Sequence, residues 1–351
     1  MDPPAGTKPS PAERPRIHTE GRNTMKTMKL GSQGLEVTVE GLGAMGMSAF
    51  YGQRDDAESS ATLNRALDLG VTLIDTAEIY GPFLNEQLIA QAIGHRRDEY
   101  ALATKFGSEV TDDGERGPVN GSPAYARKAL ERSLRNLQTE TVDLYYLHRV
   151  DPKTPIEETV GAMAEFIKEG KVRYLGLSEA APETIRRAHA VHPITALQTE
   201  YSIFEREPEG NGVLETVREL GIGYVAYSPL GRGFLTGRIS TPDDLPEGDW
   251  RRTLPRFTPE NLKANLQLVD RVKGLATAKG VTAGQLALAW VLAQGVCAIP
   301  GTKRRTYLEE NVAAAGIELT RADLDALNAA APAGSTAGTR YDEAGLKSLY
   351  K

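Results

Sequence analysis

Short apolar runs alternate with amphipathic, helix-like stretches along almost the whole chain, and this alternation restricts the fold more than any other feature. We expect eight strands, at residues 41–45, 71–77, 100–105, 142–148, 172–178, 196–202, 222–228 and 296–301. Helical patterns separate them, for example at residues 58–70, 122–137, 156–170, 209–221 and 282–295. Such alternation is typical of parallel strands joined by crossover helices. Eight repeats favour an α/β fold closed into a (β/α)8 TIM barrel over an open sheet.

The length of 351 residues suits one such barrel, because barrels with insertions often exceed roughly 250 residues as a single unit. We expect residues 29–331 to form it, with a hairpin at residues 28–41 that plugs one end. Residues 1–28 are rich in Pro and charge, so we expect a disordered extension there. Long connections at 107–121 and 230–258 follow the third and seventh strands, which places them at the carboxyl-terminal, active-site face. We expect the tail, residues 332–351, near the same face.

Charge and cysteine content exclude several classes of protein. The formal net charge of −6 disfavours general binding to nucleic acid or to an anionic membrane. No window of the sequence has the length and apolarity of a membrane span or a signal peptide. The one cysteine, Cys297, cannot form an internal disulfide and suits a reducing cytosol, so we expect a cytoplasmic protein. The sequence is compatible with both a monomer and a homo-oligomer.

The stretch "GLGAMG", residues 41–46, matches the G-x-G-x-x-G fingerprint of a dinucleotide-binding turn. That mechanism requires a helix that opens at the last glycine and an acidic residue about 20 positions later. Here Gly52 interrupts any such helix, and the first good helix start is Asp55 or Asp56. The stretch therefore disfavours an open-sheet NAD dehydrogenase, which we keep as one rival hypothesis.

Polar side chains stand where three of the expected strands end. Asp75 closes the second strand with Tyr80 just beyond, Lys105 closes the third, and His148 closes the fourth. In a barrel these ends meet at one face, so the four side chains can converge. Each of these residues alone has a structural explanation. Asp75 could cap a turn, Tyr80 could pack in the core, Lys105 could extend to solvent, and His148 could be a hydrogen-bonded core histidine. Together they are more persuasive, because a lysine that ends an apolar strand needs a counter-charge and Asp75 supplies one.

Such a group suits carbonyl reduction without a metal. The pKa of a tyrosine, near 10, falls beside an ammonium group, and a pKa of about 7 would require roughly 4 kcal/mol of differential stabilisation. The Tyr80 phenol would then protonate a carbonyl oxygen while a hydride reaches the carbon, and His148 would orient the carbonyl.

Landmarks along residues 29–340 resemble those of the aldo-keto reductases: "GLGAMGMS", "LIDTAEIYG", "ATKFG", "DLYYLHR", "GLSEA", "TEYS", "YSPLGRGFLTG" and "IPGTKR" followed by "LEEN". The resemblance implies a (β/α)8 barrel that binds NADPH without a Rossmann domain. "GLGAMG" then becomes the first strand and its loop, with Gly43 and Met45 at the cofactor. The resemblance also implies a catalytic tetrad of Asp75, Tyr80, Lys105 and His148, in which Tyr80 is the general acid of reduction.

The same resemblance assigns the NADPH contacts. Ser178, Glu179 and Gln198 would meet the nicotinamide carboxamide, and Tyr227 would stack on the ring. The family commonly has Asn where Glu179 stands, and a carboxylate cannot donate to the carboxamide carbonyl. The pyrophosphate would lie on a turn of small residues with one arginine, comprising Ser228, Pro229, Leu230, Gly231, Arg232 and Gly233. A plain glycine-rich loop is the alternative explanation.

A basic run after the eighth strand opens a helix, where barrels often bind phosphate. Thr302, Lys303 and Arg304 resemble the family's grip on the adenosine 2′-phosphate, and Glu310 and Asn311 its adenine contacts. Gly301 is also expected at the cofactor. This placement favours NADPH over NADH, although basic runs are more often simply solvated.

The leading hypothesis is therefore an NADPH-dependent reductase of small aldehydes or ketones. Phe50, Tyr51 and Trp250 are expected to line an apolar substrate pocket. The rival from another class is a nucleotide-sensing regulatory subunit that resembles channel β-subunits.

Overall fold

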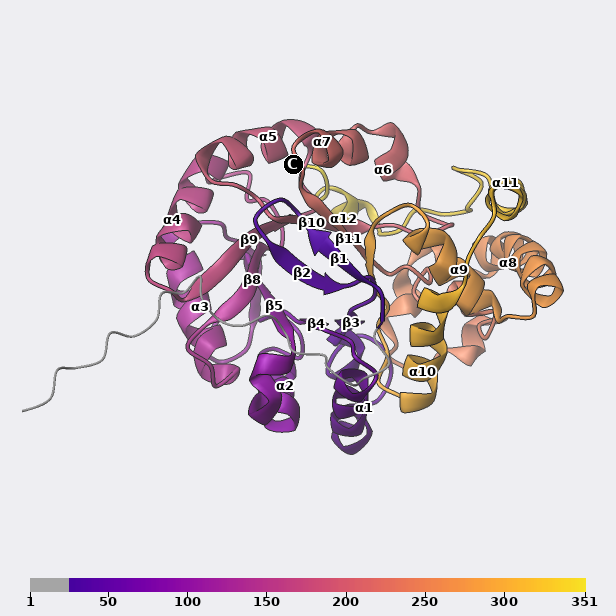
Figure 1. The fold of residues 1–351 in the computed structure, drawn as a ribbon, viewed down its shortest axis with the longest axis horizontal. Coiled ribbons are helices and arrows are strands. Elements are labelled where there is room, and N and C mark those ends of the chain that lie inside the picture. Colours follow the sequence, from indigo (N-terminus) through magenta and orange to yellow (C-terminus); the bar gives the residue numbers. More distant parts are fainter. Residues whose placement is uncertain (1–24) are drawn as a thin grey trace, which may run out of the picture.

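The computed structural model describes residues 25–351, so most of the expected extension, residues 1–24, lies outside the described residues. Eight parallel strands follow one another around a barrel (Figure 1). They are β3 (Leu42–Gly43), β4 (Leu73–Asp75), β5 (Ala101–Phe106), β8 (Val142–Leu147), β9 (Val172–Ser178), β10 (Ala196–Glu200), β11 (Gly223–Tyr227) and β12 (Cys297–Ile299). Parallel bridges from Glu40 to Ala298 and from Gly43 to Gly301 join the first strand to the last. The expected (β/α)8 barrel is confirmed.

The "GLGAMG" stretch lies at the seam of this barrel. A Cβ atom at Gly43 would lie 2.9 Å from the backbone oxygen of Ile299, so the close approach of β3 and β12 requires glycine there. A short 3-10 turn at Met45–Met47 follows, and the first α-helix begins at Asp56, capped by the Asp55 side chain. The open-sheet hypothesis is therefore wrong, and the glycines serve strand packing.

Helices form an outer ring because each buries one apolar stripe against the strands. In α3 (Pro123–Asn136), for example, Tyr125, Ala126, Ala129 and Leu130 are buried, at the three- and four-residue spacing of one helix face. The remaining helices are α1 (Asp56–Asp68), α2 (Leu84–Ile93), α4 (Ile156–Lys168), α5 (Pro182–Val191), α6 (Glu207–Gly210), α7 (Val213–Glu219), α8 (Pro259–Lys279), α9 (Ala283–Leu292), α10 (Arg305–Ala313), α11 (Arg321–Ala330) and α12 (Glu343–Leu346).

An antiparallel hairpin, β1 (Thr27–Leu30) and β2 (Leu35–Thr38), crosses the amino-terminal end of the barrel, as expected (Figure 1). Its Leu30 and Val37 side chains are buried together with barrel residues such as Leu73 and Ala196. This end is therefore plugged by apolar packing, and chemistry is left to the opposite end.

The long connections lie at the carboxyl-terminal end. Residues 107–121 form a second hairpin, β6 (Ser108–Val110) with β7 (Arg116–Val119), and residues 230–258 form four short 3-10 turns. The C-terminal tail, residues 332–351, passes the end of β9, where the backbone N–H of Tyr350 donates to the Glu179 carbonyl at 2.7 Å. Three segments far apart in sequence thus surround one mouth.

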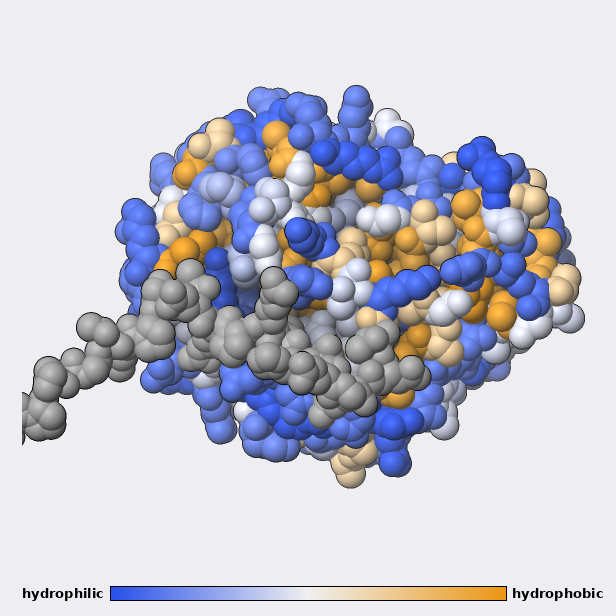
Figure 2. All heavy atoms as spheres, viewed as in Figure 1, coloured by the Kyte–Doolittle hydropathy of each residue, from blue (hydrophilic) through white to orange (hydrophobic). Residues whose placement is uncertain are grey.

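The molecular surface carries both hydrophilic and apolar residues. On the face seen in Figure 2, hydrophilic residues predominate and the larger apolar areas lie on the side of α8 and α9. Within residues 25–351 no single helix is long and apolar enough to cross a membrane, and only the pair α8 and α9, bent by 90°, would pass by combined length and composition.

Candidate active site at the carboxyl-terminal mouth of the barrel

A buried ion pair joins β4 to β5 at the mouth. Lys105 Nζ lies 2.5 Å from Asp75 Oδ1 and 2.8 Å from the Thr76 carbonyl oxygen. Gln198 Nε2, from β10 across the barrel, donates to the other Asp75 oxygen at 2.8 Å. Lys105 is fully buried, and a charge in such a position requires this pairing and hydrogen bonding.

Tyr80 and His148 lie next to that ion pair. Tyr80 Oη is 3.4 Å from Lys105 Nζ, and its ring meets the His148 ring edge-on with 5.9 Å between centroids. His148 follows β8 and is held by its backbone N–H, which donates to the Phe106 carbonyl at 2.7 Å. The structure therefore brings together all four side chains that the sequence pointed to.

The pKa of Tyr80 differs in direction from our expectation. Burial raises it well above the ordinary value, the Asp75 charge raises it further, and Arg149 opposes both. The ammonium of Lys105 is balanced by Asp75 at close range, so it does not draw the proton off the phenol. In this structure Tyr80 is a protonated hydroxyl, poised to donate.

The imidazole of His148 is neutral, because burial lowers its pKa well below the ordinary value and the charges of Arg149 and Lys105 lower it further. Its Nδ1 is enclosed without a hydrogen-bond partner, whereas Nε2 is not among the enclosed atoms. Nε2 is therefore the nitrogen that can donate to a group in the mouth when it carries the proton.

Ser178 and Gln198, expected at the carboxamide, are paired in register at the ends of β9 and β10. Glu179 points elsewhere. Its carboxylate accepts two hydrogen bonds from Arg340 of the tail, at 2.8 and 2.9 Å, and one from Tyr227 Oη at 2.8 Å. The pair outweighs the burial penalty and lowers the pKa of Glu179. The carboxylate that replaces the family's usual Asn thus anchors the tail.

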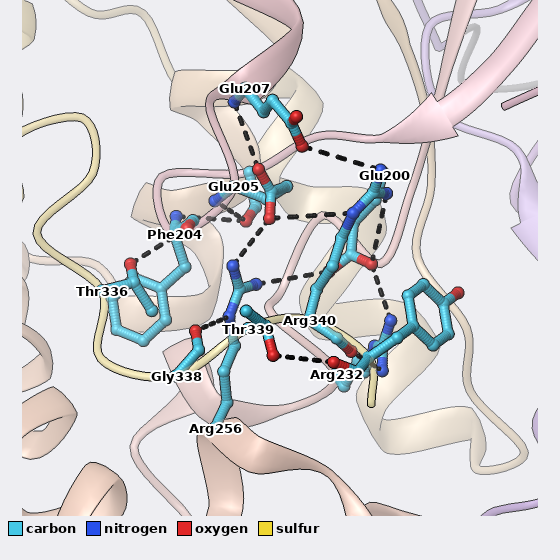
Figure 3. A network of polar contacts seen from close by, with 12 residues as sticks. Glu200, Phe204, Glu205, Glu207, Arg232, Arg256, Thr336, Gly338, Thr339 and Arg340 are labelled. Carbon is cyan, nitrogen blue, oxygen red and sulfur yellow. Dashed lines mark hydrogen bonds and ion pairs between the residues drawn. The ribbon is translucent and has the colours of Figure 1, made fainter. Parts of the chain in front are cut away.

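The turn expected at the pyrophosphate, Ser228, Pro229, Leu230, Gly231, Arg232 and Gly233, is tightly wound, with φ of 49° at Ser228 and 91° at Gly233. The Arg232 guanidinium is buried, and it donates to Glu200 at 2.7 Å and to the Arg340 carbonyl at 2.8 Å. Figure 3 shows these groups together with Glu205 and Arg256 in one ionic network. The charge of Arg232 is therefore balanced inside the protein.

The basic run after β12 meets the start of α10, as expected. Thr302 Oγ1 accepts from the Arg304 N–H at 3.1 Å, while Lys303 Nζ donates to the Tyr51 and Gln53 carbonyls at 2.6 and 2.5 Å. Arg304 directly precedes the helix, and no carboxylate of residues 25–351 forms an ion pair with it. Of the other expected contacts, Gly301 is bridged to Gly43 at the barrel seam and Met45 lies in the 3-10 turn. Asn311 is buried in α10, and Glu310 accepts hydrogen bonds from Arg238 and Thr282.

An aromatic wall stands at the rim of the mouth. The Phe50 and Trp250 rings meet with 5.5 Å between centroids, and the backbone N–H of Trp250 donates to the Phe50 carbonyl at 3.1 Å. Tyr341 of the tail packs on Trp250 at 5.9 Å, and the Arg251 guanidinium lies 4.6 Å from the Tyr51 ring centre. Arg340 and Tyr341 could not be predicted from the sequence, because a tail 161 residues from Glu179 carries no local signal of where it docks.

Residues 41–332 match the model of the aldo/keto reductase family. The chain belongs to that family. Its members are oxidoreductases, which typically use NAD(P)H on small carbonyl compounds. Within it, this aldo/keto reductase keeps acid, amine, phenol and imidazole at the mouth, but departs from the common pattern at Glu179.

Solved structures of other proteins are similar to this chain in both fold and sequence. The chain is 30% identical to a glycerol dehydrogenase from Gluconobacter oxydans, with a TM-score of 0.80 over 87% of this chain and 94% of the other. It is 30% identical to an aldo-keto reductase from Bacillus halodurans in its holo form, with a TM-score of 0.75 over 91% and 99%. It is 31% identical to a thermostable aldo-keto reductase in complex with the inhibitor epalrestat, with a TM-score of 0.71 over 87% and 100%.

Proposed function

We propose that this aldo/keto reductase uses NADPH to reduce a small aldehyde or ketone to an alcohol. The observation that carries the proposal is the convergence of Tyr80, Lys105 and His148, with Lys105 paired to Asp75, at the open end of the barrel. The neighbour from Gluconobacter oxydans is a glycerol dehydrogenase, which supports alcohol and carbonyl chemistry at such a site.

In this mechanism NADPH supplies the hydride for the carbonyl carbon. The proton comes from Tyr80 Oη and moves to the carbonyl oxygen as negative charge develops there. Lys105 Nζ, at 3.4 Å, stabilises the phenolate that remains, and Asp75 holds the ammonium in place. His148 donates a hydrogen bond from Nε2, which fixes the carbonyl oxygen beside the phenol.

The residues at the seam fit a dinucleotide that carries an extra phosphate. Arg304 stands at the amino terminus of α10 without a carboxylate partner in the described chain, and the backbone dipole of that helix favours an anion there. We assign Arg304 and Thr302 to the 2′-phosphate, and Ser178 with Gln198 to the carboxamide. Lys303 supports this site by holding the segment that contains Tyr51.

The test is NADPH oxidation with a panel of aromatic aldehydes, followed by the Tyr80→Phe variant. This variant removes the transferable proton and keeps the ring, so turnover should collapse while NADPH affinity persists. Tyr145→Phe is the matched control, because it removes a buried hydroxyl that faces helix α3 and lies outside the mouth. Equal turnover in both variants would remove Tyr80 from the mechanism. Tight NADPH binding without turnover of any aldehyde would favour the nucleotide-sensing subunit.

A further inference from the structure

Arg149 directly follows His148 at the end of β8, and its half-buried side chain lies within the mouth. Its Nη1 donates to the His148 carbonyl at 2.7 Å and to Ser178 Oγ at 3.3 Å. The mechanism proposed above does not use this side chain. Its position, between the reacting groups and the end of β9, therefore needs its own explanation.

The charge of Arg149 is balanced only at longer range, by Glu179, which is itself paired with Arg340. Three other cations near the reacting groups form ion pairs, since Lys105 pairs with Asp75, Arg340 with Glu179, and Arg232 with Glu200. For Arg149, no carboxylate of residues 25–351 lies within ion-pair distance. A partly desolvated guanidinium without a direct carboxylate partner can still gain stabilisation from an anion bound in hydrogen-bonding contact.

The free edge of the guanidinium has the shape that a carboxylate binds. Nε and Nη2 donate to no group of the described chain, and they are not among its enclosed polar atoms, so they are accessible to a ligand. These two N–H groups form one side of the planar fork, the arrangement that binds both carboxylate oxygens at once.

Arg149 also lies close to the reacting groups. Its positive charge lowers the pKa of the Tyr80 phenol and of His148, and it opposes the protonation of Lys105 as well. The hydrogen bonds of Nη1 to the His148 carbonyl and to Ser178 Oγ place the guanidinium at the ends of β8 and β9, next to His148. An anion held by Arg149 would consequently sit beside the carbonyl that Tyr80 protonates.

We propose that Arg149 binds a carboxylate on the substrate, so that this reductase acts preferentially on aldehydes or ketones that carry a carboxylate group. The inference rests on the proposed reductase function and adds the substrate class. The carboxylate takes no part in bond making. It orients the molecule and places the carbonyl between Tyr80 and His148.

The experiment compares 4-carboxybenzaldehyde with its neutral methyl ester, methyl 4-formylbenzoate, which presents the same ring and carbonyl. Wild-type enzyme should show a higher kcat/KM for the carboxylate. Arg149→Met should lower kcat/KM for the carboxylate about 10- to 100-fold, the range for loss of a charge-assisted hydrogen-bonded pair, mostly through KM. The ester should change by less than about 3-fold, and Arg149→Lys should restore part of the loss.

The exposed Arg321 on α11 provides the matched control, because Arg321→Gln removes the same charge far from the mouth. It should leave both substrates unaffected. Equal losses for acid and ester in Arg149→Met, or no preference in the wild type, would overturn the proposal. A parallel rise in the NADPH dissociation constant would instead assign Arg149 to the cofactor, which also overturns it. Turnover of the ester by wild type tests the reductase function separately.

Binding gives a readout that does not depend on turnover. Calorimetry of the NADP⁺-loaded protein with benzoate and with benzamide measures the preference for the anion directly. Benzoate should bind more tightly to wild type, and Arg149→Met should abolish the difference. If benzoate and benzamide bind wild type equally, the carboxylate site does not exist, whatever the enzyme reduces.

Discussion

The contact between Arg340 and Glu179 decides whether the C-terminal tail stays on the barrel. Arg340 is 2% exposed and Glu179 is fully buried, and two hydrogen bonds of 2.8 and 2.9 Å join them. Three further carboxylates, on Glu200, Glu205 and Glu207, lie 3.9 to 4.0 Å from the same guanidinium. We predict that Arg340→Met strongly destabilises this region, because it leaves the buried Glu179 carboxylate without its cation.

The magnitude follows from the burial of both partners. Removal of one partner from a buried ion pair costs about 3–5 kcal/mol, mainly because the other charge stays desolvated. Two charge-assisted hydrogen bonds at roughly 1.5–3 kcal/mol each give a similar range. If the tail, residues 332–351, detaches from the barrel, water reaches Glu179 and relieves its desolvation. The free energy of tail docking therefore sets an upper limit to the decrease in the global free energy of unfolding.

Two assays distinguish global destabilisation from local release of the tail. Urea denaturation measures the global free energy of unfolding, and limited proteolysis measures exposure of the tail in the folded protein. Arg340→Met should lower the first by up to about 3–5 kcal/mol or increase cleavage within residues 332–351. The double variant Arg340→Met with Glu179→Gln removes the stranded charge and should recover at least half of the effect.

A change of less than about 1 kcal/mol in the free energy of unfolding of Arg340→Met, the value typical of a surface ion pair, with no extra cleavage of the tail, would refute this prediction. Failure of the double variant to recover would show that lost packing of the Arg340 stem, rather than the unpaired Glu179, causes the effect. Arg321→Met, at an exposed pair with Asp325, should leave both assays unchanged.

Three other predictions follow from the geometry of the barrel and its mouth. Gly43→Ala should cost about 1–3 kcal/mol of stability, because the new Cβ would lie 2.9 Å from the Ile299 carbonyl oxygen at the barrel seam; an unchanged urea midpoint would contradict this. Arg304→Ala should weaken NADPH binding at least about 10-fold more than NADH binding, measured by quenching of protein fluorescence. Arg305→Ala, the control whose arginine pairs with Glu58, should leave the ratio of the two dissociation constants unchanged. Equal losses of affinity for both cofactors in Arg304→Ala would refute the 2′-phosphate assignment. The kcat/KM for carbonyl reduction should stay flat from about pH 6 to 9. The raised pKa of Tyr80 keeps the phenol protonated at the upper limit, and the lowered pKa of His148 keeps the imidazole neutral at the lower limit. A steep loss of kcat/KM near pH 7 would show that one of these two pKa shifts has the wrong direction.

Much of this protein could be predicted from its sequence, because the relevant signals are local. The alternation of strand and helix patterns reports which face of each element is apolar, and that is enough to predict a barrel. The strand ends are also local, so Asp75, Lys105 and His148 could be placed on one face before any coordinates were known. The family landmarks added the order of the loops that surround that face.

The partners of the charged side chains were decided only by the tertiary structure. Glu179 and Arg232 stand at positions that suggested cofactor contacts, yet one is paired with Arg340 and the other with Glu200. The direction of the Tyr80 pKa shift also reversed, because burial of the phenol and the nearby Asp75 charge both raise its pKa. Local patterns specify which elements form, whereas the free energy of a buried charge depends on neighbours brought from anywhere in the chain, here from a tail more than a hundred residues away.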